Sequence, residues 1–141
     1  MSLWHLFNLL LEELNRLLPE KKEESPVLLI GKIPHHQLPN WYSRSDFYIS
    51  ASHYEGSGTA LCEAMSCGCI PLVSDISPFR KISGSHALFF EPGNVESLLS
   101  ILIESGRLKV EDEKIRVLNH FKRNLSFPAI AEKFEKIMAA I

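Results

Sequence analysis

Two acidic residues, Glu55 and Glu63, flank a Gly-Ser-Gly turn in the stretch HYEGSGTALCEAMSCGCIPLVSD, which covers residues 53–75. Eight residues are close to two turns of an unbroken helix, but Gly56 and Gly58 disfavour such a helix because glycine is a poor helix former. We therefore expect Glu55 on a loop and Glu63 inside the helix that follows. The two carboxylates would then reach one site from different backbone elements.

The start of that helix is the expected site for an anion. Its first backbone amides, those of Gly58, Thr59 and Ala60, lack partners within the helix and lie at the positive end of the helix dipole. A phosphate or pyrophosphate could bind there, and Glu63 could accept hydrogen bonds from the hydroxyls of a ribose. Glu55 could bind a second polyol, so the arrangement suits a nucleotide sugar. Solvated or capping roles for both acids remain the alternative.

Alternating strands and helices should position this site. The predicted strands cover residues 27–31, 46–52, 70–75 and 87–94. The predicted helices cover residues 3–18, a short segment around Pro39, 58–67, a turn within 76–86, 95–106, a segment within 111–125 and 129–141, with Asn94 and Ser126 as starting residues. Short connections between these elements predict an α/β fold, a three-layer Rossmann-like domain with a parallel sheet of about four strands. Ligands of such sheets bind beyond the carboxyl ends of the strands, where residues 53–58 would lie.

Composition narrows the classes of function. The 141 residues fit one compact domain. With 15 basic and 17 acidic side chains, the net charge of -2 gives no electrostatic case for nucleic acid as a partner. No apolar run reaches the roughly 20 residues of a membrane span, and no basic leader is visible, so we expect a cytoplasmic protein. Cys62, Cys67 and Cys69 are odd in number and lack a paired C-x2-C, so we expect no metal site.

The stretch from Glu55 to Asp75 closely resembles the signature of retaining GT-B glycosyltransferases of family 4, also called group 1. That signature reads EGxGxxxxEAMxxGxPVxxSD, with its acids in an E-x7-E motif. Downstream, ALFFEPGNVESL resembles the family segment "lf.PgN.e.L". Upstream, VLLIGKIPHHQLPNWYSRSDFYISAS resembles "V.f.G.v....lp..y..aD.fv.pS". The likeness covers residues 27–102 and is continuous.

The resemblance implies that residues 1–141 are part of the C-terminal, donor-binding domain of a GT-B enzyme, with the N-terminal acceptor domain absent. It implies that Glu55 is catalytic and bonds a hydroxyl of the donor sugar, while Glu63 binds the ribose. The implied donor-binding residues are Gly56, Ser57, Gly58, Thr59, Ala60 and Glu63, together with Lys32 and Ile33, which would contact the base through backbone groups.

The same resemblance implies the partners of the full-length protein. The donor would be a UDP-sugar or GDP-sugar, and no metal or other cofactor is expected. The acceptor would be a glycan or a lipid-linked molecule held through the missing N-terminal domain. Nucleic acid is not expected as a partner, and membrane association would be at most peripheral, at the inner face.

Three departures from the family pattern limit these implications. Ser57 stands where the family usually has a bulky apolar residue, and Lys81 stands where related sequences often carry Glu. The Arg and Lys that bind pyrophosphate in the family are not visible, and Arg80 and Lys81 read as a solvated face instead. We therefore expect the isolated chain to be catalytically poor. A sugar-nucleotide epimerase-like enzyme and a non-catalytic nucleotide-sugar-binding module remain as alternatives.

Overall fold

A computed structural model describes residue 28 and residues 30–140 of the chain. The chain divides into two compact units, residues 1–34 and residues 35–141. The helix predicted over residues 3–18 lies outside the described residues. The strand predicted over 27–31 is wrong where that stretch is described, because neither Leu28 nor Ile30 lies in a strand.

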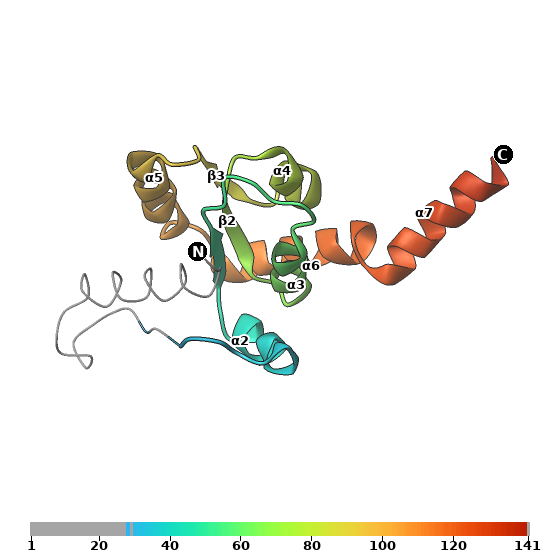
Figure 1. The fold of residues 1–141 in the computed structure, drawn as a ribbon, viewed down its shortest axis with the longest axis horizontal. Helices are drawn as coiled ribbons and strands as arrows, with labels where there is room; N and C mark the ends of the chain where they lie inside the picture. Colours follow the sequence, from blue (N-terminus) through green and yellow to red (C-terminus); the bar gives the residue numbers. More distant parts are fainter. Residues whose placement is uncertain (1–27, 29, 141) are drawn as a thin grey trace, which may run out of the picture. The chain divides into compact units, whose positions relative to one another are not determined.

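The second unit contains a parallel sheet in the order β1, β2, β3 (Figure 1). The strands are β1 (Phe47–Ser50), β2 (Ile70–Ser74) and β3 (Leu88–Phe90). Phe47 lies opposite Ile70 in the first pair, and Leu72 lies opposite Leu88 in the second. Every residue of the central strand β2 is buried, as expected for a strand covered on both faces. The predicted α/β, Rossmann-like class is confirmed, with three strands in the described residues instead of about four.

Helices connect the strands and cover them. The helix α3 (Thr59–Ser66) joins β1 to β2, and α4 (Ser77–Ser83) joins β2 to β3. The other helical elements are η2 (His35–Gln37), α2 (Leu38–Ser43), α5 (Val95–Ser105), α6 (Val110–Asn124) and α7 (Phe127–Ala139). Both α3 and α6 pack against β2 and against each other, while α5 packs against β3. No helix in the described part of the chain is long and apolar enough to cross a membrane.

Short-range signals set the ends of several helices. The side-chain oxygen of Asn94 accepts a hydrogen bond from the backbone N–H of Ser97 at 2.9 Å, and Ser126 caps α7 in the same way. Both predicted starting residues are therefore confirmed. Gly68 follows α3 with a φ of 84°, a left-handed conformation that suits glycine and ends the helix.

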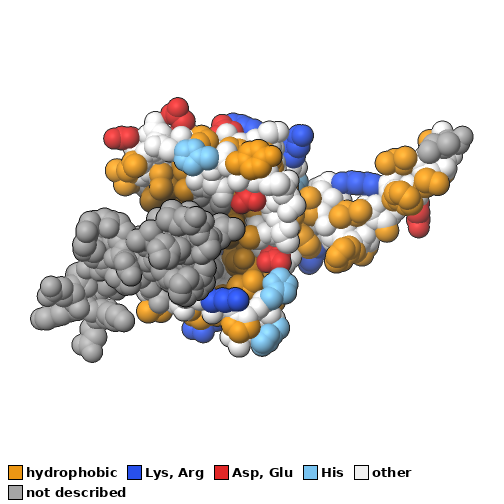
Figure 2. Space-filling model, viewed as in Figure 1, with side chains coloured by type: hydrophobic (Ala, Val, Ile, Leu, Met, Phe, Trp, Pro, Cys, Tyr) orange, Lys and Arg blue, Asp and Glu red, His pale blue; other side chains and the backbone are white. Residues whose placement is uncertain are grey.

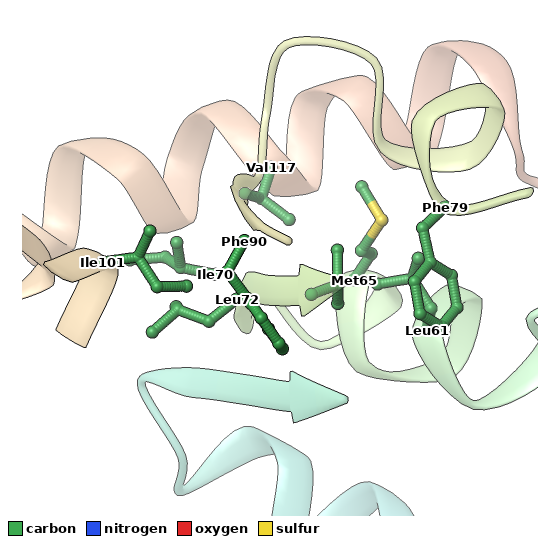
Figure 3. Close-up of a cluster of buried hydrophobic side chains, with 9 residues drawn as sticks. Leu61, Met65, Ile70, Leu72, Phe79, Phe90, Ile101 and Val117 are labelled. Carbon is green, nitrogen blue, oxygen red and sulfur yellow. The ribbon is translucent and has the colours of Figure 1, made fainter. Parts of the chain in front are cut away.

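The core lies around the central strand and the inner side of α3 (Figure 3). It consists of Leu61, Met65, Ile70, Leu72, Val73, Phe79, Phe90, Ile101 and Val117. Leu61 and Met65 come from α3 and are fully buried. Because burial of such side chains stabilises by about 1.5–3 kcal/mol each, α3 is held firmly against the sheet. This packing fixes the helix whose first turn belongs to the candidate site.

The last helix, α7, has no buried residue and contacts α6. Hydrophobic side chains spread along it in Figure 2. The large apolar residues that α7 exposes are Phe127, Ile130, Phe134, Ile137 and Met138. Since none of them is buried, α7 contributes little to the core of this unit.

Candidate functional site

The segments that follow the three strands meet at the carboxyl edge of the sheet. The buried hydroxyl of Ser74, at the end of β2, donates to the backbone carbonyl of Ser52 in the loop after β1. The backbone N–H of Asp75 donates to the carbonyl of Phe90 at 2.7 Å, which ties the ends of β2 and β3 together. The loop over residues 51–58 is therefore anchored to the sheet edge, as the sequence predicted.

The first turn of α3 is open to a ligand. Its N-cap residue, Gly58, is buried with a φ of 61°, whereas Thr59 and Ala60 are exposed. The turn carries no acidic residue, and among the described residues no side chain caps it. Ser57 and Thr59 share a hydrogen bond of 2.9 Å between their hydroxyls. The amides at this helix start therefore remain free for an anion.

Glu63, one turn into α3, lines a cavity of about 100 Å³. Its Oε1 lies 3.7 Å from Nε2 of His35, and its side chain is 30% exposed. The cavity is lined by His35, Leu38, Pro39, Tyr42, Glu63, Ser66 and Cys67. Burial raises the pKa of the Tyr42 phenol, and the negative charge of Glu63 raises that pKa further. Glu63 therefore presents a partly shielded carboxylate to a hollow between α2 and α3.

Tyr48 on β1 carries a half-buried phenol whose pKa is raised. Burial is the main cause of the raised pKa of Tyr48, and a hydrogen bond with Ser50 lowers it. The negative charges of Glu55 and Glu63 both raise that pKa further. Glu55 lies on a loop and Glu63 lies inside α3, as the sequence predicted. That the two acids reach one ligand stays a prediction.

Glu55 itself is half-buried and held by the loop that carries it. The hydroxyl of Ser52 donates to Oε1 of Glu55 at 3.1 Å. Ser52 in turn lies 3.2 Å from the hydroxyl of Ser50, the last residue of β1. The position of Glu55 is thus linked directly to the end of a strand.

Cys62 precedes Glu63 in the chain and Cys67 lines the cavity with it, whereas Cys69 is buried. Among the described residues no group of three or more metal-binding side chains occurs. Burial raises the pKa of the Cys69 thiol to about 11, so this thiol is neutral at ordinary pH. Burial also raises the pKa of Cys62. Independence from metal ions stays a prediction.

Arg80 is engaged at the carboxyl end of β2. Its guanidinium donates two hydrogen bonds to the carboxylate of Asp75 and lies 4.7 Å from the ring centre of Phe89. The hydrogen bond from Arg80 lowers the pKa of Asp75. Since this cation already has an anionic partner, the prediction that it does not replace the pyrophosphate-binding Arg of the family pattern is kept.

Two of the predicted donor-binding residues belong to the first unit. Lys32 and Ile33 belong to residues 1–34, so their contact with a base stays a prediction. Four residues were not predicted as site residues: Leu38, Pro39 and Tyr42, which line the cavity, and Ser52. Their signal was present, because these residues occupy the l, p, y and S positions of the upstream pattern.

Comparisons with known proteins agree with the sequence pattern. The family model described as "Glycosyl transferases group 1" matches residues 11–115. O-antigen chain mannosyltransferase B of Escherichia coli is 28% identical over 58% of this chain and 22% of its own length. The phosphatidylinositol N-acetylglucosaminyltransferase gpi3 subunit of Schizosaccharomyces pombe is 26% identical over 82% of this chain and 26% of its own length.

The name of a third relative includes a nucleotide sugar. GDP-mannose:cellobiosyl-diphosphopolyprenol alpha-mannosyltransferase of Xanthomonas campestris is 26% identical over 75% of this chain and 25% of its own length. The chain thus spans about a quarter of the length of these relatives. Among solved structures, sucrose-phosphate synthase from Thermosynechococcus elongatus has the same fold over 93% of this chain and 34% of its own, with a TM-score of 0.60 and 22% identity.

Proposed function

Because this chain belongs to the group 1 glycosyltransferases, we propose that it forms the donor-binding part of an enzyme that transfers a sugar from a nucleoside diphosphate to an acceptor. One observation carries the proposal: the loop that holds Glu55 is bonded to the end of β2 and runs into the uncapped start of α3, one turn before Glu63, which lines the cavity. A diphosphate at these amides would have one carboxylate available for the ribose and another for the sugar.

The amides at the start of α3 would support the chemical step. In the proposed retaining transfer, the bond from the anomeric carbon to the diphosphate oxygen breaks, and an acceptor oxygen bonds to that carbon on the same face. The acceptor's proton passes to the departing diphosphate. Negative charge gathers on that diphosphate, and fixed N–H donors at a helix start stabilise such charge. We expect no need for a divalent cation, so EDTA should leave turnover unchanged.

The cavity beside Glu63 suits only part of a donor. Its volume of about 100 Å³ is small against the roughly 300–1,000 Å³ of ordinary ligand sites. We assign the nucleoside to this cavity, with Glu63 accepting from the ribose hydroxyls, and the sugar to the neighbourhood of Glu55. Because two of the relatives are named as mannosyltransferases and one names GDP-mannose, GDP-mannose is the first donor to test.

The acceptor is assigned to the rest of the full-length protein. We propose a glycan or lipid-linked acceptor, held by residues that this chain does not contain. Much of the rate of group transfer comes from holding both reactants in position. The chain alone should therefore bind the donor but transfer its sugar only slowly.

Two binding measurements test the proposed function. Calorimetric titration with GDP, UDP, GDP-mannose and UDP-N-acetylglucosamine should detect saturable binding of at least one nucleoside diphosphate and its sugar. The bound nucleotide should also slow alkylation of Cys67, which lines the cavity, more than alkylation of Cys62, which does not line it. Absence of binding by all four compounds to the full-length protein would contradict the proposal.

A further inference from the structure

The contact between Ser52 and Glu55 joins two half-buried side chains on one loop, at 3.1 Å. A carboxylate only accepts hydrogen bonds, so the Ser52 hydroxyl is the donor. The bond occupies Oε1 of Glu55, while the other carboxylate oxygen makes no hydrogen bond with the described residues. That second oxygen is left to accept a hydrogen bond from a ligand.

Ser52 is itself fixed from two directions. The hydroxyl of Ser74, which is fully buried at the end of β2, donates to the Ser52 carbonyl. The Ser50 hydroxyl lies 3.2 Å from that of Ser52. The Ser52 hydroxyl therefore lies between the end of β1 and Glu55, while its carbonyl is held by the end of β2.

We propose that Ser52 is a positioning residue, which holds Glu55 in the orientation that receives a hydroxyl of the donor sugar. The proposal rests on the proposed function and adds to it a residue that need not touch the donor. A free glutamate side chain has several rotamers, and ordering it during binding costs entropy. The hydrogen bond from Ser52 removes part of that cost beforehand, since Ser52 is tied to the ends of β1 and β2.

A double-mutant cycle in the full-length protein tests this role. The readout is hydrolysis of GDP-mannose, or of UDP-N-acetylglucosamine if that donor binds more tightly. Ser52→Ala should lower kcat roughly tenfold, as loss of a hydrogen bond to a charged group would, with little change in the Kd for the free nucleoside diphosphate. In a Glu55→Gln background the same substitution should have almost no further effect. Ser52→Thr, which keeps a hydroxyl, should restore most of the activity.

A matched control is Ser100→Ala, which removes a serine hydroxyl bonded to the Glu96 carbonyl within α5. It should leave kcat unchanged. Equal effects of Ser52→Ala in the two backgrounds, or a loss of nucleotide binding as large as the loss of kcat, would overturn the positioning role.

A second readout separates this inference from the proposed function. In the ligand-free chain, the carboxyl ¹³C resonance of Glu55 should shift in Ser52→Ala and not in Ser100→Ala. An unchanged resonance would overturn the inference even if donor binds. Absence of nucleotide binding by the unaltered protein would contradict the proposed function instead, whatever the resonance does.

Discussion

A Cβ atom at Gly58 would overlap Cδ1 of Ile82, a residue of α4. Gly58 also has a φ of 61°, in the left-handed region that other residues rarely adopt. The residue that opens α3 is therefore constrained twice, by its own backbone and by a neighbouring helix. Glycine satisfies both constraints.

Gly58→Ala should destabilise the protein by about 1–3 kcal/mol, because alanine must adopt the left-handed conformation and displace Ile82. Urea unfolding measures the loss. Gly56→Ala is the matched control, since Gly56 has open space around its Cα and no positive φ. Equal destabilisation by the two substitutions would show that neither constraint at Gly58 matters.

Glu63→Gln should weaken binding of the free nucleoside diphosphate roughly 10- to 100-fold, as expected for hydrogen bonds to a charged group. Glu55→Gln should chiefly lower turnover of the intact donor. Calorimetry with GDP or UDP and donor hydrolysis measure the two effects separately. Glu104→Gln, which alters an exposed residue of α5, serves as a control. Small and equal effects at Glu55 and Glu63 would contradict the assigned roles.

Stability should fall as the pH decreases below about 6.5, partly because of His86. Burial and the neighbouring charge of His120 lower the pKa of His86 below its ordinary value of 6.5, and Arg116 adds to this while Glu113 opposes it. The unfolded chain therefore binds the proton more tightly, so the contribution of His86 is complete above pH 6.5 and is lost as the pH falls through its lowered pKa.

The His86→Phe variant keeps a ring against His120, whose ring centre lies 4.7 Å away, and removes the titration. Its free energy of unfolding should therefore decrease less than that of the unaltered protein between pH 7.5 and pH 5.5. Urea unfolding at both pH values gives the difference. The same decrease in both proteins would exclude a contribution from His86.

Replacement by alanine should destabilise the protein strongly at one phenylalanine and hardly at all at another. Phe79 is 1% exposed in the core, whereas Phe134 on α7 is 62% exposed. Phe79→Ala should cost about 3–5 kcal/mol of unfolding free energy, and Phe134→Ala should change it by about 0.5 kcal/mol or less. Thermal or urea unfolding distinguishes them. A large loss from Phe134→Ala would mean that α7 contributes to the core after all.

The strand expected over residues 27–31 illustrates a limit of sequence reasoning. Leu28 and Ile30 belong to a short apolar run, but neither lies in a strand. Such a run is compatible with a buried strand, but a strand also needs a hydrogen-bonded neighbour along its edge. The run itself carries no information about that neighbour.

The sequence by itself determined the features that depend on neighbouring residues. The side chain of Asn94 caps α5 by accepting from the backbone N–H three residues further on. Gly58 precedes the first residue of α3 in a left-handed conformation that glycine adopts readily. The sequence likewise predicted Glu55 before that start and Glu63 after it, and it showed the family pattern.

Only the tertiary structure decided how these acids are held. Ser74 bonds to Ser52 across 22 residues, and Glu63 lines a cavity together with Leu38, Pro39 and Tyr42 of α2. These contacts depend on the register of β1 against β2 and on the packing of α3 over them. Register and packing arise from the balance of contacts across the whole core, so no single stretch of sequence contains them.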